Sequence, residues 1–313
     1  MSGQVRAVGL AELPTIGRAV VTMGVFDGVH LGHRAILEAT RDEAARTGVT
    51  SLALVFDPPP DEVLRPGTSV ARLAPLAVNL SRIEGFGIDR AVPIHFEDDV
   101  RQLTAEAFLA ALSPAIALEG LTMSTRSAFG RDRGGTASRM QQLGAELGFA
   151  VRLVEPVEVG GAIVSSSRIR AVIADGHVAV SRALGVVPYL EGIVVTGDRR
   201  GRALGFPTAN LRFDYSPAMP SNGIYAGRVT EARGVTAGHP ALISIGTRPT
   251  FHDDANVQAE VHLLDFDGDL YGAPLGVELF ARLRDQQRFA DADALVTQMH
   301  RDAKRGRLVL GMS

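Results

Sequence analysis

The sequence feature that most constrains the fold is a regular alternation of short apolar runs with helix-like stretches up to about Gly176. Runs 19–23 and 50–56 are apolar, partly β-branched and short enough to be buried strands. Further strand candidates lie at 90–94, 118–123 and 150–154, and helix-like patterns lie at 33–47, 75–84, 104–112 and 136–147. Alternation of this kind predicts an α/β domain with a parallel sheet and helices on both of its faces.

The pattern changes after Gly176, where a helical stretch at 178–184 leads into short β-rich runs separated by Gly and Pro. These runs lie at 190–196, 224–230, 241–245, 257–264 and 277–283. Several short strands with turn signals between them predict a small antiparallel β-barrel. The chain closes at 291–305 with an apolar stripe, early acidic residues and late basic residues, which indicates a C-terminal helix. We therefore expect two domains, residues 1–184 and 185–313.

The composition restricts the classes of function and partner. A chain of 313 residues, 46% hydrophobic and 21% charged, is typical of a folded globular protein that is long enough for two cores. A net charge of -3 gives no general attraction for nucleic acid or an anionic membrane, so we expect neither as a partner. The absence of Cys excludes disulfides and thiolate chemistry. Without a leader-like N-terminus or a run of about 18 apolar residues, we expect a cytoplasmic protein.

The first strand candidate runs directly into the decapeptide GVFDGVHLGH, residues 24–33, at the start of a helical pattern. Glycines after a parallel strand let the backbone approach a phosphate, and the following helix N-terminus supplies free N–H groups. His30 and His33 are three residues apart, so both rings can face one ligand such as a triphosphate. Two alternatives remain for this pair: half of a zinc site, or a capping and packing pair.

A second group of oxyanion-binding residue types lies in VSSSRIR, residues 164–170, at the start of another helical pattern. Three hydroxyls and two guanidinium groups at a helix N-terminus suit phosphate oxygens, because Arg presents paired donors. The alternative is an ordinary serine N-cap followed by solvated arginines.

Together these two motifs resemble the nucleotidyltransferase family of class I synthetase-like enzymes, in particular the FMN adenylyltransferase half of bacterial bifunctional riboflavin kinase/FAD synthetases. The resemblance implies a Rossmann-like domain in which the FMN phosphate attacks the α-phosphorus of ATP, giving FAD and releasing pyrophosphate. It implies catalytic roles for His30, His33 and Arg170. It also implies that ATP is bound by Gly24, Phe26, Asp27, Gly32, Ser165, Ser166 and Ser167. Such catalysis rests on positioning and charge stabilisation.

The sequence departs from that family on the side of the acceptor. Pro59 stands where the family usually has His, and Arg126 and Ser127 replace an acidic or amide residue and an aromatic residue of the flavin-facing loop. Three hypotheses follow for the N-terminal domain. It adenylylates FMN, it transfers a nucleotide to another acceptor, or it binds a nucleotide as a regulatory module without turning it over.

The barrel region opens with a glycine-rich basic stretch, VVTGDRRGRALGFPTANL, residues 194–211. Gly197, Gly201 and Gly205 permit close backbone approach to a ligand. Thr208 and Asn210 offer neutral oxygen ligands that suit a hard cation such as magnesium. Pro207 restricts its own φ and the conformation of Phe206, which stiffens the loop. Taken without its neighbours, such a turn could equally be an ordinary hairpin.

The string LGFPTAN, with NGIYAGRV, SIGTRPTF, AEVHLLDFDGDLYG and FARLRDQQRF in the same order, resembles riboflavin kinases over nearly the whole C-terminal segment. The resemblance implies phosphorylation of riboflavin to FMN by ATP with Mg2+, the metal being held at Thr208 and Asn210. Glu260 would be the general base for the ribityl hydroxyl, although its position alone also suits the polar face of an alternating strand. The resemblance further implies ligand contacts from Gly197, Gly201, Gly205, Phe206 and Pro207, and it implies that Arg284 belongs to a flap that closes over the flavin.

Overall fold

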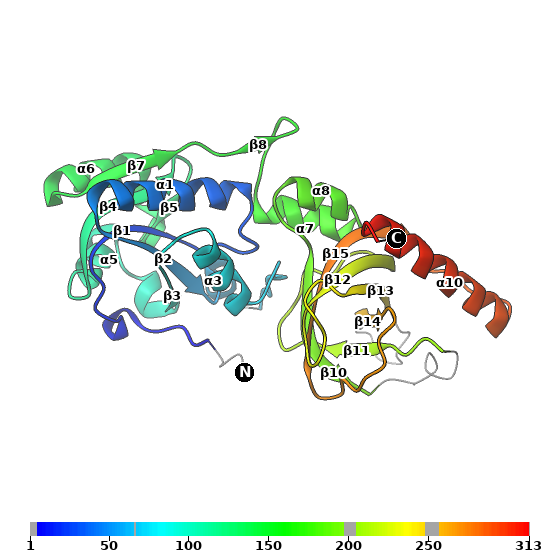
Figure 1. The fold of residues 1–313 in the computed structure, drawn as a ribbon. Helices are drawn as coiled ribbons and strands as arrows, with labels where there is room; N and C mark the ends of the chain where they lie inside the picture. Colours follow the sequence, from blue (N-terminus) through cyan, green and yellow to red (C-terminus); the bar gives the residue numbers. More distant parts are fainter. Residues whose placement is uncertain (1–4, 66, 197–204, 248–256, 313) are drawn as a thin grey trace. The chain divides into compact units, whose positions relative to one another are not determined.

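The structure of the chain is a computed structural model that describes residues 5–65, 67–196, 205–247 and 257–312 (Figure 1). The chain divides into two compact units, one of Met1–Val70 and Pro75–Ser165, the other of Ala71–Ala74 and Ser166–Ser313. Residues 166–184, which we assigned from the sequence to the N-terminal domain, therefore pack with the second unit. The division at 184/185 stays a prediction about which residues carry each activity.

The first unit is built on a five-stranded sheet in the order β3-β2-β1-β4-β7, and every pairing in it is parallel. Its strands are β1 (Gly17–Gly24), β2 (Thr50–Asp57), β3 (Arg90–His95), β4 (Ile116–Ser124) and β7 (Ala150–Val154). The predicted parallel sheet is thus confirmed. Two short hairpins that the sequence did not predict are β5 (Ala128–Phe129) with β6 (Gly135–Thr136), and β8 (Glu158–Val159) with β9 (Ala162–Ile163).

Helices cover both faces of this sheet. They are η1 (Leu10–Glu12), α1 (Leu31–Thr47), α2 (Pro60–Leu64), α3 (Leu76–Gly85), α4 (Asp98–Arg101), α5 (Ala105–Leu112), η2 (Arg131–Arg133) and α6 (Ala137–Leu147). Successive residues of β2 point to opposite faces, so Ala53 and Val55 pack with residues of α1 and α3, whereas Leu52 and Leu54 pack with Phe108 of α5. This is the doubly wound arrangement predicted from the alternation.

The strand order places β1 at the centre of the sheet, between β2 and β4. Strand order reverses at β1, because β2 and β3 follow on one side of it while β4 and β7 follow on the other. In open α/β sheets, ligands bind beyond the carboxyl ends of the strands at such a switch point. The segment after Gly24 therefore occupies the position where the fold favours a binding site.

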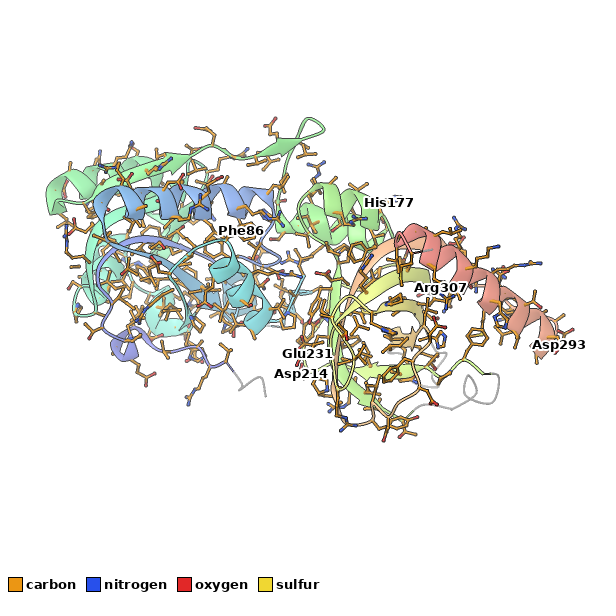
Figure 2. All side chains as sticks on the ribbon, in the orientation of Figure 1. Phe86, His177, Asp214, Glu231, Asp293 and Arg307 are labelled. Carbon is orange, nitrogen blue, oxygen red and sulfur yellow. The ribbon has the colours of Figure 1, made fainter. Side chains whose placement is uncertain are left out.

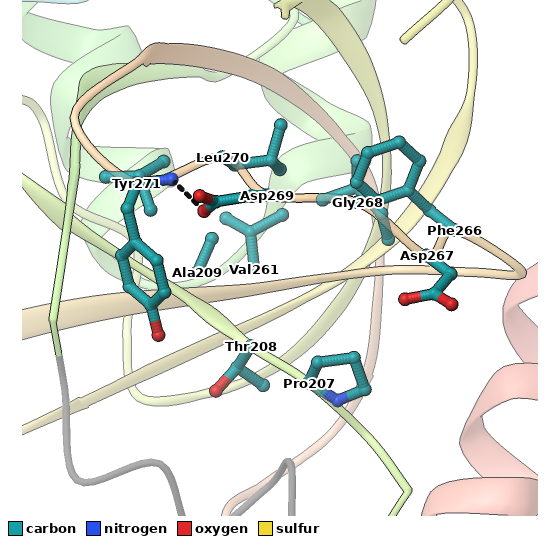
Figure 3. A pocket seen from close by; sticks show the side chains of 12 residues that line it. Pro207, Thr208, Ala209, Val261, Phe266, Asp267, Gly268, Asp269, Leu270 and Tyr271 are labelled. Carbon is teal, nitrogen blue, oxygen red and sulfur yellow. Dashed lines mark hydrogen bonds between the residues drawn. The ribbon is translucent and has the colours of Figure 1, made fainter. Parts of the chain in front are cut away.

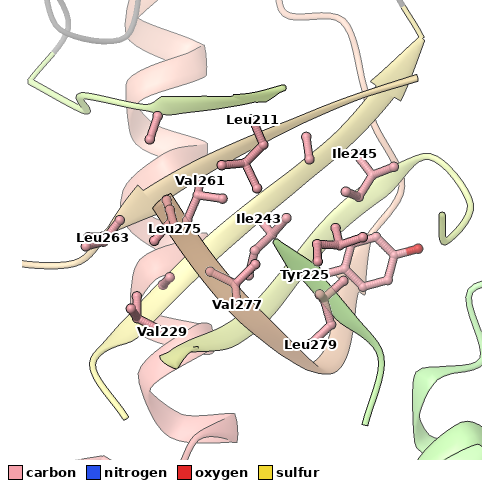
Figure 4. Close-up of a cluster of buried hydrophobic side chains, with 14 of the residues drawn as sticks. Leu211, Tyr225, Val229, Ile243, Ile245, Val261, Leu263, Leu275, Val277 and Leu279 are labelled. Atoms are coloured by element: carbon pink, nitrogen blue, oxygen red, sulfur yellow. The ribbon is translucent and has the colours of Figure 1, made fainter. Parts of the chain in front are cut away.

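The second unit contains a closed antiparallel barrel in the order β10-β11-β14-β13-β12-β15. Its strands are β10 (Tyr189–Val195), β11 (Ala209–Arg212), β12 (Gly223–Ala232), β13 (Pro240–Thr247), β14 (Val257–Leu263) and β15 (Pro274–Arg284). Buried side chains fill its interior, among them Tyr225, Ile243, Val261 and Val277 (Figure 4). The predicted barrel is confirmed, and β11 adds a strand in a stretch that we had interpreted as loop.

Three helices of the second unit are α7 (Ser166–Ala174), α8 (Val178–Ala183) and α10 (Ala292–Val309). Asp291 caps α10, because its carboxylate accepts a hydrogen bond from Ala294 N–H at 2.8 Å. Asp293 lies in the first turn and Arg307 in the last, so the predicted charge order along the helix is confirmed (Figure 2). Among the helices that the structure describes, none is long and apolar enough to span a membrane.

Candidate active sites

The segment after β1 is a tight turn with an unusual backbone. Phe26, Gly28 and Val29 have φ of 50°, 80° and 48°, and Val29 N–H donates to the carbonyl of Phe26 at 3.1 Å. A positive φ is strained for Phe and for the β-branched Val, and such strain persists only where the surroundings hold it. Both side chains are buried, with 2% and 1% of their surface exposed, and they belong to one apolar cluster with Leu80 and Ile83 of α3.

The two histidines lie at the N-terminus of α1. His30 is the N-cap, and its Nδ1 accepts a hydrogen bond from His33 N–H at 3.2 Å. The two rings stack with centroids 3.6 Å apart and planes inclined by 13°. The capping and packing alternative is therefore observed, and it is compatible with anion binding because the first N–H groups of an α-helix have no partner within the helix.

The backbone at Gly32 is closely packed against this histidine pair. A Cβ at Gly32 would lie 3.2 Å from the ring of His30 and 3.5 Å from the carbonyl oxygen of Val164. The zinc alternative has no support in the described parts of the chain, where no group of three His, Asp or Glu side chains could hold a metal ion.

The serine-rich motif forms a helix start, as predicted. Ser165 ends the first unit, and Ser166 begins α7 in the second. Within the second unit, Arg170 on α7 donates from Nε to the carbonyl of Ala71 at 2.6 Å, so part of its guanidinium group binds backbone. Ser167 lies in the first turn of the same helix. An ATP site formed jointly by this motif and residues 24–33 stays a prediction.

The residues that depart from the family pattern lie close to the carboxyl edge of the sheet. Pro59 is the N-cap of α2, directly after β2. Arg126 and Ser127 are exposed in the turn between β4 and β5, where Ser127 N–H donates to the carbonyl of Ser124 at 3.0 Å. Their location therefore suits contact with an acceptor bound beyond the strand ends.

The barrel brings Asn210 and Glu260 together across a strand pair. β11 and β14 pair with Ala209 opposite Val261 and with Asn210 opposite Glu260. Ala209 and Val261 are buried in the barrel core, so the alternation of side chains places Asn210 and Glu260 together on the other face of this pair. Thr208 shares that face, and its Oγ1 lies 3.4 Å from Oε2 of Glu260 as a hydrogen-bond donor.

A cavity of about 420 Å³ opens beside this strand pair (Figure 3). Its walls combine apolar side chains from the strands with the polar turn that follows β14. It is lined by Val194, Pro207, Thr208, Ala209, Val261, Leu263, Phe266, Asp267, Gly268, Asp269, Leu270 and Tyr271. The turn is ordered by Asp269, whose Oδ1 accepts a hydrogen bond from Tyr271 N–H at 2.9 Å. The cavity therefore offers apolar surface and hydrogen-bonding groups in similar measure.

The segment 205–210 is anchored by two histidines to which the sequence assigned no role. Nδ1 of His262 on β14 donates to the carbonyl of Pro207 at 2.8 Å. The ring of Phe206 packs between His262, at 5.1 Å, and His300 of α10, at 5.0 Å. Burial lowers the pKa of His262, although the bond to Pro207 opposes that shift. Gly205 has φ of 80°, which explains a glycine before this anchored segment.

Arg284, which we predicted to contact the flavin, binds a carboxylate of α10 in this structure. Its Nε and Nη2 donate to Oδ2 of Asp302 at 2.9 and 2.7 Å, and Asp302 is 4% exposed. Its guanidinium carbon lies 5.8 Å from the ring centre of Phe289. A flavin contact by Arg284 stays a prediction. Gly197 and Gly201 lie outside the described residues.

Comparisons with known families and proteins cover both units. A family model described as FAD synthetase matches residues 14–168, and one described as riboflavin kinase matches residues 184–310. Over 296 residues the chain is 36% identical to a bifunctional riboflavin kinase/FMN adenylyltransferase of Pseudomonas fluorescens, covering 94% of each protein. Over 309 residues it is 35% identical to the bifunctional riboflavin kinase/FMN adenylyltransferase of Escherichia coli K12, covering 97% of this chain and 96% of the relative.

A solved structure shares the fold over nearly the full length. It is described as a macrolide-efflux protein from Streptococcus pneumoniae, and it matches with a TM-score of 0.86 and 29% identity, covering 96% of this chain and 97% of its own. Its description names another activity, whereas the two family models and the relatives above name the same pair of enzymes for the two halves.

Proposed function

The chain belongs to the family of bifunctional riboflavin kinase/FMN adenylyltransferases, and we propose that it carries out both reactions of flavin cofactor synthesis. The C-terminal barrel phosphorylates riboflavin with ATP to give FMN and ADP. The N-terminal unit transfers AMP from ATP to FMN, giving FAD and pyrophosphate. The alternatives, another acceptor or a regulatory nucleotide-binding module, are not favoured, because each half matches the corresponding enzyme.

The observation that carries the kinase half is the alignment of Thr208, Asn210 and Glu260 on one face of β11 and β14. In the proposed step, Glu260 accepts the proton of the ribityl 5′-hydroxyl as that oxygen forms a bond to the γ-phosphorus of ATP. The bond between the γ-phosphorus and its bridging oxygen breaks, and ADP leaves. A carboxylate within hydrogen-bond reach of the hydroxyl suffices, because phosphoryl transfer depends mainly on alignment and charge neutralisation.

Magnesium fits the donors at this face. The Thr208 hydroxyl and the Asn210 amide would offer oxygen ligands beside the Glu260 carboxylate, and such ligands suit a hard cation that is also bound by substrate phosphates. When bound, the ion would neutralise phosphate charge. The adjoining cavity, walled by Val194, Leu263 and Leu270 among others, is our candidate for the nucleotide base.

For adenylyl transfer, we propose that the turn after β1 and the N-terminus of α1 bind the ATP phosphates. An oxygen of the FMN phosphate forms a bond to the α-phosphorus, and the bond to the leaving pyrophosphate breaks. His30 and His33 would stabilise phosphate charge beside the helix N-terminus, with Gly24, Phe26, Asp27 and Gly32 shaping the turn. From the resemblance to the family motif, we propose a catalytic role for Arg170. The same resemblance supports ATP binding by Ser165, Ser166 and Ser167.

The test is a chromatogram of products from the purified chain with magnesium. Riboflavin and ATP should give FMN and then FAD, and FMN and ATP should give FAD and pyrophosphate. If folded protein makes no FMN from riboflavin, the kinase assignment is wrong. If it makes FMN but forms no FAD from added FMN, the adenylyl-transfer assignment is wrong. Repeating the second reaction with each of the four common nucleoside triphosphates tests the choice of ATP.

A further inference from the structure

The turn that follows β1 is held from outside by a buried amide side chain of α3. Oδ1 of Asn79 accepts a hydrogen bond from Gly28 N–H at 3.0 Å, and its Nδ2 donates to Oδ1 of Asp27 at 3.5 Å. Asn79 is 4% exposed and Asp27 is 2% exposed. Asn79 is thus a buried polar residue that bonds two consecutive residues of the turn.

The chemistry of the two partners fixes which way the amide faces. A backbone N–H can only donate, so it requires the amide oxygen, and a carboxylate oxygen accepts from the amide nitrogen. One Asn side chain therefore satisfies two neighbouring groups of opposite type. An apolar residue at 79 would leave the N–H of Gly28 buried without this acceptor, which is costly inside a protein.

The hydrogen bond from Gly28 N–H to Asn79 lies between the two strained residues of the turn. Phe26 and Val29 both have positive φ, and Gly28 lies directly between Asp27 and Val29. Leu80 and Ile83 of α3 pack with Phe26 and Val29 of the turn in one buried apolar cluster. The helix thus holds the turn both by its amide and by its apolar side chains.

We infer that Asn79 is a positioning residue for adenylyl transfer, which holds the Phe26–Val29 turn in the conformation that presents the N-terminus of α1 to the ATP phosphates. It acts through Gly28 and Asp27 and needs no contact with ATP itself. The inference rests on the adenylyl transfer proposed above, and it adds to that reaction a residue outside the GVFDGVHLGH motif.

The test compares Asn79→Leu and Asn79→Asp with Ser81→Ala, a control at an exposed position of the same helix. Asn79→Leu removes both hydrogen bonds, and Asn79→Asp keeps an acceptor for Gly28 but replaces the donor to Asp27 with a second buried carboxylate. We expect the KM for ATP in FAD formation to rise about tenfold in Asn79→Leu. In Asn79→Asp we expect a rise at least as large, because two buried carboxylates repel each other. The riboflavin kinase activity of the same molecules should stay unchanged, which shows that the barrel unit is folded. The circular dichroism spectrum of each variant, compared with that of Ser81→Ala, checks that the N-terminal unit is folded as well.

A purely structural role for Asn79 would give another result. Partial unfolding reduces the number of active molecules, so kcat would fall while the KM for ATP stayed the same. That outcome, or kinetics equal to those of Ser81→Ala, would overturn the inference.

Hydrogen exchange tests the positioning without relying on catalysis. The amides of residues 24–33 should exchange faster in Asn79→Leu than in Ser81→Ala, measured by mass spectrometry on the free protein. Equal exchange in the two variants would contradict the inference. An unsubstituted chain that forms no FAD would instead count against the proposed function, and the exchange result would still decide whether Asn79 holds the turn.

Discussion

The two candidate sites present their ligand-binding groups in different ways. In the barrel, strand pairing aligns the side chains of Thr208, Asn210 and Glu260 on one face. In the N-terminal unit, a strained turn and the start of α1 present mainly backbone N–H groups. Asn79 of α3, which is distant in sequence, holds the turn by a hydrogen bond. The barrel site should therefore be sensitive to its own side chains, whereas the N-terminal site should also be sensitive to residues that only support the backbone.

The largest effect should follow Glu260→Gln. Glutamine keeps the size of the side chain but cannot accept the hydroxyl proton as a carboxylate does, so FMN formation should fall by about a thousandfold. FAD formation from added FMN should stay unchanged, because it takes place at the other site. Both rates are measured by chromatography of the flavins. Retained kinase activity would show that Glu260 serves only as a partly buried polar residue of β14.

Two substitutions at His30 distinguish a role in adenylyl transfer from a role as the N-cap of α1. His30→Asn keeps an N-cap side chain for α1, whereas His30→Ala removes it, and both lose the imidazole ring. FAD formation should fall about a hundredfold in both variants. Both variants lose the packing of the ring, and His30→Ala should lose about 1 kcal/mol more stability than His30→Asn, seen as a lower unfolding midpoint. If His30→Asn forms FAD at the normal rate, the histidine is a cap alone, and the backbone accounts for phosphate binding at this end.

Thr208→Val tests whether the hydroxyl of Thr208 takes part in the barrel site, because valine has nearly the same shape but no hydroxyl. Loss of the hydroxyl beside Glu260 should lower kcat/KM for riboflavin phosphorylation about tenfold and should raise the magnesium concentration needed for half-maximal rate. The matched control is Thr236→Val, at an exposed position of the same unit. An unchanged magnesium requirement in Thr208→Val would remove Thr208 from the proposed metal site.

The smallest effect concerns the pH dependence of barrel stability. Burial lowers the pKa of His262 below its ordinary value of 6.5, so the unfolded chain takes up a proton at this residue before the folded chain does. The stability that neutral His262 contributes is therefore present above pH 6.5 and is lost as the pH falls through the lower pKa of the folded state. His262→Phe keeps a ring beside Phe206 and cannot titrate. Its unfolding free energy, measured by denaturant titration from pH 7 to pH 5, should decline less than that of the unsubstituted chain, and parallel declines would contradict this.

Much of the secondary structure of both units could be predicted from local sequence patterns. The long-range contacts that support these elements could not. The apolar runs 19–23 and 50–56 predicted β1 and β2, and the acidic-to-basic order of 291–305 predicted α10. β11 was missed because its four residues, Ala209–Arg212, follow a Gly- and Pro-rich stretch that indicates a loop. Such a short strand is defined by its pairing with β10 and β14, which only the closed barrel supplies.

The same distinction holds within the sites. Residues 24–33 and Gly205–Asn210 are contiguous motifs, and their chemistry could be interpreted from residue type and spacing. Asn79, His262 and Asp302 act on residues that are distant in sequence, and each required the folded structure. The signal for Asn79 was a polar side chain at a buried position of a helix, next to Leu80. That signal indicates a hydrogen-bond partner but does not identify it.

The central claim is that one chain holds two independent sites, one for each reaction. The most direct measurement is a flavin chromatogram of Glu260→Gln and His30→Asn, each supplied with ATP and magnesium and with either riboflavin or FMN. Glu260→Gln should form FAD from FMN but no FMN from riboflavin, and His30→Asn should convert riboflavin to FMN that accumulates without becoming FAD. If either folded variant loses both reactions together, the two activities share a site and the account is wrong.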